Sequence, residues 1–254
     1  MARIAVFDSG LGSLSIIREI QKKIKSEIIY FGDQKNFPYG KKSKHELGKI
    51  IEKTIKMLKE NFSPDLIVIG SNTPTIILGI ENRKIIGVKP PIKEAEKISK
   101  TKSIGILGTE SLIKSRELSQ FIRNLNLNKS TKIHKINGSP LVELVESGKF
   151  LTNKSFCKKI IRENLEKEIM TKKIDVITLS STHLPFLKSM IENEFKEIKL
   201  IDPASIVTNK IYSIIKNKQE KKNKIKIFSS GDVKKFQNNL CKLGIKNKVN
   251  FLSF

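Results

Sequence analysis

The sequence predicts an α/β protein made of two similar doubly wound parallel-sheet domains, related by a pseudo-twofold axis and with a ligand cleft between them. Three observations predict this fold class. Short apolar runs rich in Ile and Val alternate with longer amphipathic stretches, small or polar residues follow the apolar runs directly, and two stretches of the first half recur in the second. Such runs are typical of parallel strands that helices cover on both faces. A length of 254 residues allows one large domain or two smaller ones.

The apolar runs indicate the strands and the amphipathic stretches indicate the helices. Strands are predicted at residues 4–7, 27–31, 66–69, 85–88, 103–107, 131–136, 176–179, 198–201 and 224–228. Helices are predicted at residues 14–25, 43–61, 91–100, 113–125, 140–147, 154–172, 184–194, 204–216 and 233–243. A lysine-rich stretch, residues 216–226, lies between a predicted helix and a predicted strand, and we expect it to form a loop.

The chain contains an internal repeat of a strand followed by a polar turn. In residues 65–74 and again in residues 175–185, an aspartate precedes a serine by six residues, and residues 4–10 parallel residues 104–110. Two copies in the same order predict two related domains, with limits at 1–92 plus 206–254 and at 93–205. One polar turn from each domain would then flank the cleft. This arrangement suits a two-base reaction, in which one group removes a proton and its counterpart delivers one to the opposite face.

Composition argues against several classes of protein. The formal net charge of +24 comes mostly from lysines spread along the chain, without interleaved aromatic residues that could stack on bases. We therefore expect weak, salt-sensitive binding to polyanions and no specific nucleic acid partner. No apolar run approaches the ~18 residues of a membrane span, and no signal peptide precedes the first predicted strand. Two cysteines, Cys157 and Cys241, have neither disulfide nor metal spacing, so we expect a cytoplasmic protein.

Four predicted strands end in polar turns, at residues 8–10, 70–73, 108–109 and 180–183. Ligands of doubly wound folds collect at the carboxyl ends of the strands, so these turns are the expected site. Taken singly, several of their residues have a simpler explanation. Asp8, Ser71 and Ser181 could be helix N-caps, and His183 could be a hydrogen-bonded structural histidine.

Taken together, the turns resemble the motifs of the cofactor-independent glutamate and aspartate racemases. The segment FDSGLGSLS at residues 7–15 resembles the opening signature of that family, followed by GD at 32–33 and PYG at 38–40. The segment SNT at 71–73 resembles the first cysteine motif, Cys-Asn-Thr. The segment STHLP at 181–185 resembles the second, Cys-Thr-His-Tyr-Pro. Further similarities at residues 104–109, 140–148, 200–202 and 231–232 extend the match, in order, over nearly all of the chain.

The resemblance implies a role for each residue at a matching position. The implied catalytic residues are Asp8, Asp33, Ser71, Glu146, Ser181 and His183. The implied substrate-binding residues are Ser9, Pro38, Tyr39, Gly40, Asn72, Thr73, Thr109 and Thr182. The implied ligand is a small acidic amino acid such as glutamate or aspartate. No PLP, nucleotide or metal motif is present, so no cofactor is expected, and a homodimer is an option that the resemblance leaves open.

The sequence departs from the family at the two proton-transferring cysteines, which are Ser71 and Ser181 here. A free thiol has a pKa of about 8.5, whereas a serine hydroxyl is closer to the roughly 15.7 of water. We therefore expect racemisation to be weak or lost and ligand binding to survive. Two alternatives stay open. The chain could be a non-catalytic binding homologue, or an active racemase in which cysteines have been replaced by serine.

Overall fold

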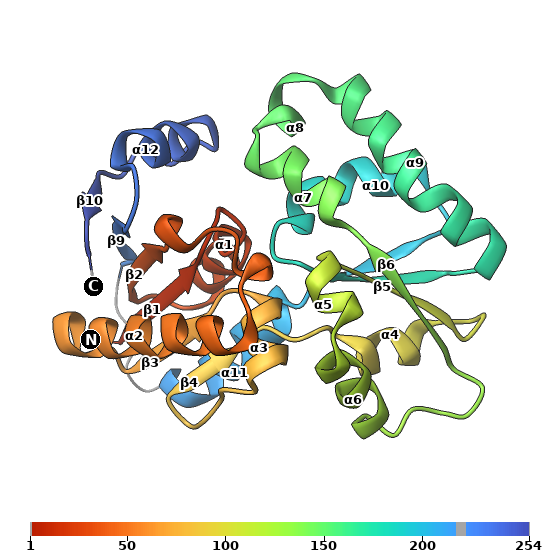
Figure 1. The fold of residues 1–254 in the computed structure, drawn as a ribbon, viewed down its shortest axis with the longest axis horizontal. Helices are drawn as coiled ribbons and strands as arrows, with labels where there is room; N and C mark the ends of the chain where they lie inside the picture. The colour runs from red at the N-terminus through yellow and green to blue at the C-terminus, as the bar shows by residue number, and fades with distance from the viewer. Residues whose placement is uncertain (1, 217–221, 254) are drawn as a thin grey trace. The chain divides into compact units, whose positions relative to one another are not determined.

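The computed structural model describes residues 2–216 and 222–253. The chain divides into two compact units (Figure 1). Unit 1 comprises Met1–Val88 and Ala204–Phe254, and unit 2 comprises Lys89–Pro203. Unit 2 is therefore an insertion between two segments of unit 1. Of the predicted lysine-rich loop, residues 217–221 lie outside the described residues.

Unit 1 is built on a sheet of six parallel strands in the order β10-β9-β2-β1-β3-β4. Its strands are β1 (Arg3–Asp8), β2 (Glu27–Gly32), β3 (Leu66–Ile69), β4 (Ile85–Gly87), β9 (Lys224–Ser229) and β10 (Val249–Phe251). Its helices are α1 (Leu14–Lys23), α2 (Lys44–Phe62), α3 (Asn72–Leu78), α11 (Ala204–Ile215) and α12 (Val233–Lys242), with the 3-10 turns η1 (Gln34–Asn36) and η2 (Tyr39–Lys41).

The core of unit 1 follows from the alternation of side chains along its strands. Phe7 and Phe31 lie on the face that α2 covers with Leu47 and Ile51. Tyr30 points to the opposite face, where its ring lies 5.9 Å from that of Phe236 in α12. Both faces of the central strands are therefore buried, as the Ile- and Val-rich runs predict.

Unit 2 is built on a sheet of four parallel strands in the order β6-β5-β7-β8. Its strands are β5 (Ser103–Gly108), β6 (Lys132–Asn137), β7 (Val176–Ser180) and β8 (Lys199–Ile201). Its helices are α4 (Ile92–Ile98), α5 (Glu110–Lys114), α6 (Arg116–Asn124), α7 (Ser139–Glu146), α8 (Lys149–Thr152), α9 (Lys154–Lys172) and α10 (Lys188–Glu194), with the 3-10 turn η3 (Leu184–Leu187). Figure 1 shows α4 to α6 on one face of this sheet and α7 to α10 on the other. The predicted α/β class with two parallel sheets is confirmed.

The two sheets share one topology, because β2-β1-β3-β4 and β6-β5-β7-β8 have the same order of connection. The two aspartates of the sequence repeat occupy equivalent places. The amide of Asp65 donates to the carbonyl of Arg3 at the start of β1, and the amide of Asp175 donates to that of Ser103 at the start of β5. The internal repeat read in the sequence therefore corresponds to a repeated strand order.

Several elements differ from the prediction. The helix predicted at 113–125 is divided into α5 and α6, because Ser115 is extended (φ −68°, ψ 145°) and its side chain caps α6 at the amide of Leu118. The helix predicted at 184–194 begins as the 3-10 turn η3 before α10. Five short elements, η1, η2, α3, α8 and β10, lie where no element was predicted.

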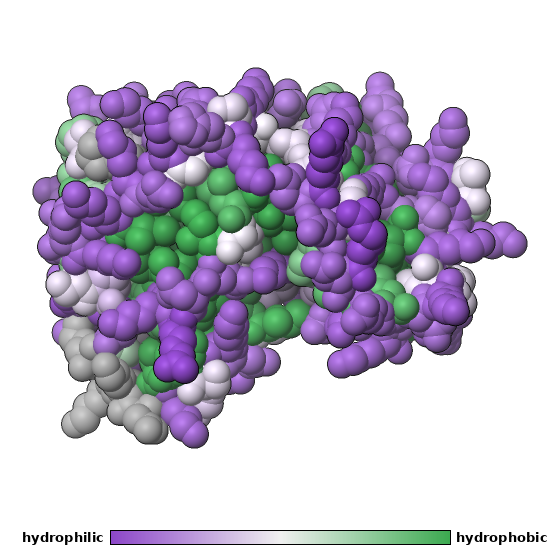
Figure 2. Space-filling model, turned by 60° about the horizontal axis from the view of Figure 1, so that its bottom comes forward, coloured by the Kyte–Doolittle hydropathy of each residue, from purple (hydrophilic) through white to green (hydrophobic). Residues whose placement is uncertain are grey.

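The face that Figure 2 shows is covered mostly by hydrophilic residues, with hydrophobic residues gathered in patches. In unit 1, Ile55, Ile80 and Ile85 line a depression that charged side chains of α2 border, among them Lys56 and Glu60. Among the described residues, no helix is both long and apolar enough to cross a bilayer.

Glu27 of β2 forms ion pairs with residues of the two neighbouring strands, β1 and β9. Its side chain is buried, and its carboxylate lies 2.6 Å from Arg3 Nε and 2.8 Å from Lys226 Nζ. Burial raises the pKa of Glu27, but the hydrogen bonds from Lys226 and Arg3 together outweigh it, so the pKa lies below its usual value. The ionised form is thus the one that stabilises the fold.

We expect Glu27→Gln to lower the free energy of unfolding by about 1–3 kcal/mol at neutral pH. Because the folded-state pKa is depressed, this contribution is present above the unfolded pKa of about 4.3 and is lost as the pH falls. Urea unfolding at neutral pH and at about pH 3 measures the loss of unfolding free energy at each pH. Glu60→Gln is the control, because Glu60 is exposed and lies 3.9 Å from Lys56. A deficit that stays unchanged in acid would contradict the assigned charge effect.

Candidate functional site

In unit 1, the predicted site residues meet at the carboxyl edge of the sheet. Asp8 is the last residue of β1, Asp33 directly follows β2, and Ser71 follows β3 by two residues. The register pairs Asp8 with Gly32 and Phe7 with Ile69. The three side chains therefore begin on neighbouring strands at the same edge, as parallel strands require.

Asp33 is completely buried and is the centre of a hydrogen-bond network. Its carboxylate accepts from the hydroxyl of Tyr39 (3.0 Å), the hydroxyl of Ser230 (2.8 Å) and the side-chain amide of Asn36 (2.9 and 3.0 Å). A buried carboxylate with several donors is held in place and strongly bound to them. Asp33 thus ties the 34–41 turn to the end of β9.

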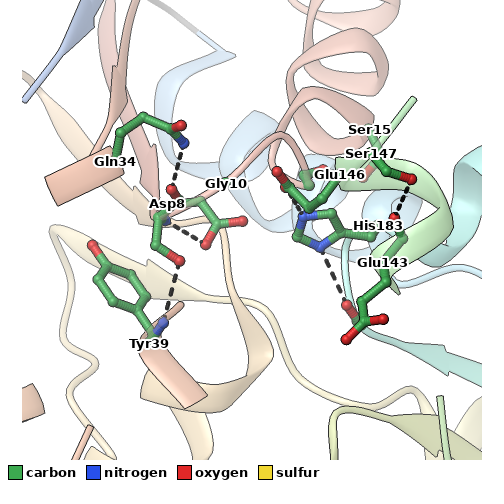
Figure 3. A network of polar contacts seen from close by, with 12 residues as sticks. Asp8, Gly10, Ser15, Gln34, Tyr39, Glu143, Glu146, Ser147 and His183 are labelled. Carbon is green, nitrogen blue, oxygen red and sulfur yellow. Dashed lines mark hydrogen bonds and ion pairs between the residues drawn. The ribbon is translucent and has the colours of Figure 1, made fainter. Parts of the chain in front are cut away.

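The 34–41 turn is also joined to the turn after β1 (Figure 3). The amide of Tyr39 donates to Ser9 Oγ at 3.4 Å, the side-chain amide of Gln34 donates to the carbonyl of Ser9 at 2.7 Å, and the amide of Ser9 donates to Asp8 Oδ1 at 2.7 Å. Burial first, and then the negative charges of Asp33 and Asp8, raise the pKa of Tyr39 well above its usual value. The phenol therefore stays a hydrogen-bond donor.

Pro38 and Gly40 lie on either side of Tyr39 in this turn. The peptide bond between Phe37 and Pro38 is cis, and Gly40 is the middle residue of η2. Tyr39, between them, is the residue whose amide contacts Ser9.

The first serine turn differs from a simple capping turn. Ser71 holds the N-cap position of α3, but its hydroxyl makes no capping hydrogen bond in the described structure. Asn72 is only 2% exposed, and neither atom of its side-chain amide has a partner within the described residues. A buried amide without partners is costly. Asn72, followed by the buried Thr73, is therefore available to bind a ligand group.

In unit 2, three predicted residues form a continuous chain of contacts. Ser181 Oγ lies 3.4 Å from His183 Nδ1, and His183 Nε2 lies 2.5 Å from Glu146 Oε1. Ser181 and His183 follow β7, and Glu146 is the last residue of α7, which packs on η3. Ser181 is 5% exposed and His183 is 7% exposed. The side chains of His183 and Glu146 face each other in Figure 3.

The remaining predicted residues of unit 2 lie at the same sheet edge. Thr109 follows β5 and caps α5, because its hydroxyl accepts from the amide of Leu112 at 3.4 Å. Thr182 is buried between Ser181 and His183. The alternative that Ser181 is a helix N-cap is wrong, since the N-cap residues of η3 and α10 are His183 and Leu187.

Sequence reasoning missed three residues that complete the network of unit 1: Gln34, Asn36 and Ser230. Gln34 and Asn36 lie between the GD and PYG motifs, where the sequence gave no sign of the direction of their side chains. Ser230 directly follows β9, and its place after a strand was the available signal. In the part of the chain that the structure describes, no group of three or more His, Cys, Asp or Glu residues could hold a metal ion.

Comparison with known proteins identifies relatives along most of the chain. No protein-family model matches it. The chain is 35% identical over 225 residues to a glutamate racemase of Buchnera aphidicola, covering 86% of this chain and 87% of the relative. It is 32% identical over 242 residues to a glutamate racemase of Limosilactobacillus reuteri, covering 91% and 88%.

Solved structures share the fold. A glutamate racemase isoform of Bacillus anthracis superposes with a TM-score of 0.86 at 25% identity, covering 100% of this chain and 98% of that one. A Francisella tularensis glutamate racemase in complex with D-glutamate superposes with a TM-score of 0.81 at 24% identity, covering 99% and 97%. The Escherichia coli enzyme, in complex with L-glutamate and an activator, gives 0.82 at 21% identity, covering 99% and 98%.

The repeated sheets with polar turns at their carboxyl edges place this protein in the class of two-domain α/β racemase folds. With relatives above 30% identity across most of both chains, it belongs to the glutamate racemase family. The resemblance read from the sequence motifs is thereby confirmed.

We expect Tyr39→Phe to lower the free energy of unfolding by about 1.5–3 kcal/mol, because a buried carboxylate loses a donor. Since burial and the charges nearby raise the pKa of Tyr39, its contribution is present below about pH 10 and fades as the pH rises further. Urea unfolding of both proteins provides the measurement. Tyr212→Phe removes the same oxygen from a half-buried ring beside Lys23 and is the matched control. Equal losses in the two variants would contradict a special role of the Asp33 network.

Proposed function

We propose that this chain binds a small acidic amino acid, glutamate before aspartate, and that it interconverts the L- and D-forms slowly or not at all. The observation that carries the proposal is a pair of serines, Ser71 and Ser181, at the two positions where the family motifs have cysteine. Membership of the family supports the ligand class, and the polar residues around both serines support binding. A non-catalytic binding protein is the limiting case of the same proposal.

Binding needs groups for a carboxylate and for an ammonium, and unit 1 offers both kinds. The side-chain amide of Asn72 has no partner among the described residues. Thr73, which follows it, and Ser9, in the turn after β1, are buried residues with hydroxyl groups. The carboxylate of Asp8 at the end of β1 suits an ammonium group. None of these groups depends on a thiol.

Proton transfer is the step that serine weakens. Abstraction of an α-proton requires a base, and a hydroxyl is many pKa units harder to ionise than a thiol. At about 1.36 kcal/mol per unit, a deficit of several units removes roughly 5 kcal/mol or more from the driving force. A serine can act only with a base beside it.

The turns that contain Ser71 and Ser181 differ in whether a histidine lies beside the serine. Ser181 lies against His183, which Glu146 orients. The 70–73 turn contains no histidine. We therefore infer that any residual exchange of the α-proton is faster for one enantiomer than for the other.

We propose that Asp33 acts by position instead of as a general base, because three side chains occupy its carboxylate. We propose a cytoplasmic location, which agrees with the free thiols of Cys157 and Cys241. A homodimer stays a prediction that sedimentation can test.

The first experiment separates binding from turnover. Calorimetry with L- and D-glutamate and with L-aspartate should give heat of binding, and NMR in D₂O should show little or no loss of α-proton signal, with a bias toward one enantiomer. Asn72→Ala should weaken binding by about 1–3 kcal/mol, the cost of losing a buried polar partner. Exchange of both enantiomers at equal and rapid rates would contradict the proposed weakness of the serines.

The second experiment replaces both serines by cysteine, the residue of the family motifs. The double variant Ser71→Cys, Ser181→Cys should racemise glutamate at least about 10³-fold faster than the unchanged protein, since about 1.36 kcal/mol corresponds to a tenfold change in rate. Each single variant is the matched control and should regain little, because the reaction uses one group on each face of Cα. A double variant that binds glutamate but stays inactive would show that the loss lies elsewhere in the site.

A further inference from the structure

Three side chains of unit 2 have the connectivity of an activated nucleophile. A hydroxyl (Ser181), an imidazole (His183) and a carboxylate (Glu146) follow one another at 3.4 Å and 2.5 Å. We propose that they form a nucleophilic triad, in which Ser181 accepts an acyl group from small carboxylic esters. This activity goes beyond racemisation, because it forms a bond to Ser181 and does not involve an α-proton.

The contact with Glu146 sets the tautomer that the reaction needs. A carboxylate only accepts hydrogen bonds, so the proton on His183 lies at Nε2, where it is donated to Glu146 Oε1. Nδ1 then carries the lone pair, and Nδ1 is the atom that faces Ser181 Oγ. Two conditions activate a serine: a base within hydrogen-bond distance of its hydroxyl, and a carboxylate that orients this base. The 3.4 Å separation is within the looser range of sites without substrate.

The position of Ser181 in the fold suits a nucleophile. It follows β7 directly and precedes η3, so it lies on a turn from a strand into a helix at the carboxyl edge of the sheet. Nucleophilic serines of α/β hydrolases occupy the same kind of turn. Because Ser181 is only 5% exposed, the acyl donor must be small.

The matching serine of the first repeat is an internal comparison. Ser71 and Ser181 follow equivalent strands, β3 and β7, by the repeat of strand order. Only Ser181 has a histidine at hydrogen-bond distance among the described contacts. Reactivity confined to Ser181 would therefore be due to the triad and not to the turn.

The proposed step is an ordinary acyl transfer. Ser181 Oγ attacks the ester carbonyl carbon while its proton passes to His183 Nδ1. The bond from that carbon to the leaving oxygen then breaks, and the leaving alcohol takes the proton from Nδ1. Water attacks the acyl-serine in the same way, which releases the carboxylic acid and restores the Ser181 hydroxyl.

The test uses the whole chain and two small probes. Phenylmethylsulfonyl fluoride should add one sulfonyl group, and peptide mapping by mass spectrometry should find it on Ser181 and not on Ser71. With p-nitrophenyl acetate, an acetyl group that hydroxylamine removes should appear on Ser181. Acetyl groups on the many lysines are amides and resist hydroxylamine, so they are distinguished in the same spectra.

The variants assign the roles. Ser181→Ala should abolish this adduct, and His183→Gln should slow its formation by about 100-fold or more, the usual contribution of a general base. Glu146 is a positioning residue. Glu146→Gln should slow the reaction at least about tenfold and should lower the pH at which the reactivity of Ser181 reaches half its maximum, whereas Glu146→Asp should restore part of the rate.

Three results would overturn the proposal. The first is labelling of Ser71 and Ser181 at equal rates, and the second is labelling of Ser181 that is unchanged in His183→Gln. The third is labelling of lysines alone in the folded, unchanged protein. Circular dichroism of each variant verifies that it is folded. The outcome is independent of α-proton exchange, so failure of either proposal leaves the other measurable.

Discussion

All strands of both sheets are parallel, and this constraint places the candidate site. Parallel strands bring their carboxyl ends to one edge, where the chain turns outward into the following helix. In unit 1 that edge carries Asp8 and Ser71, and in unit 2 it carries Ser181. These polar residues are distant in the sequence. They share an edge because the hydrogen-bond register aligns the carboxyl ends of the parallel strands.

The two sheets share a strand order, but the side chains at their carboxyl edges differ. The backbone contact between Asp8 and Asp33 in unit 1 corresponds to the contact between Gly108 and Gly138 in unit 2. Unit 1 therefore has two carboxylates at this edge, whereas the equivalent positions of unit 2 have no side chain. In unit 2 a carboxylate comes from a helix instead, because Glu146 of α7 contacts His183 in the turn after β7. Equal topology thus supports two different arrangements of carboxylates at the carboxyl edge of a sheet.

The sequence predicted the strands well because Ile and Val runs report burial on both faces, and β3 was predicted with its observed limits. It missed β10, a strand of three residues in which only Val249 is buried, and α3, whose opening Asn-Thr-Pro reads as a turn although Pro74 is tolerated in a first helical turn. Among the site residues, neighbours in sequence were placed together by the motifs. The resemblance groups Glu146 and His183 on the side of the second serine, but their direct contact could not be predicted, because it depends on how α7 packs on η3.

The insertion of unit 2 into unit 1 sets an order of assembly during synthesis. The ribosome makes β5 to β8 as one uninterrupted segment, so the smaller sheet has all its strands as soon as residue 203 has emerged. At that moment β2 still lacks its neighbour β9, and Glu27 lacks Lys226. The larger sheet, although its first strand is synthesised first, is completed last, because β9 and β10 follow unit 2 in the chain.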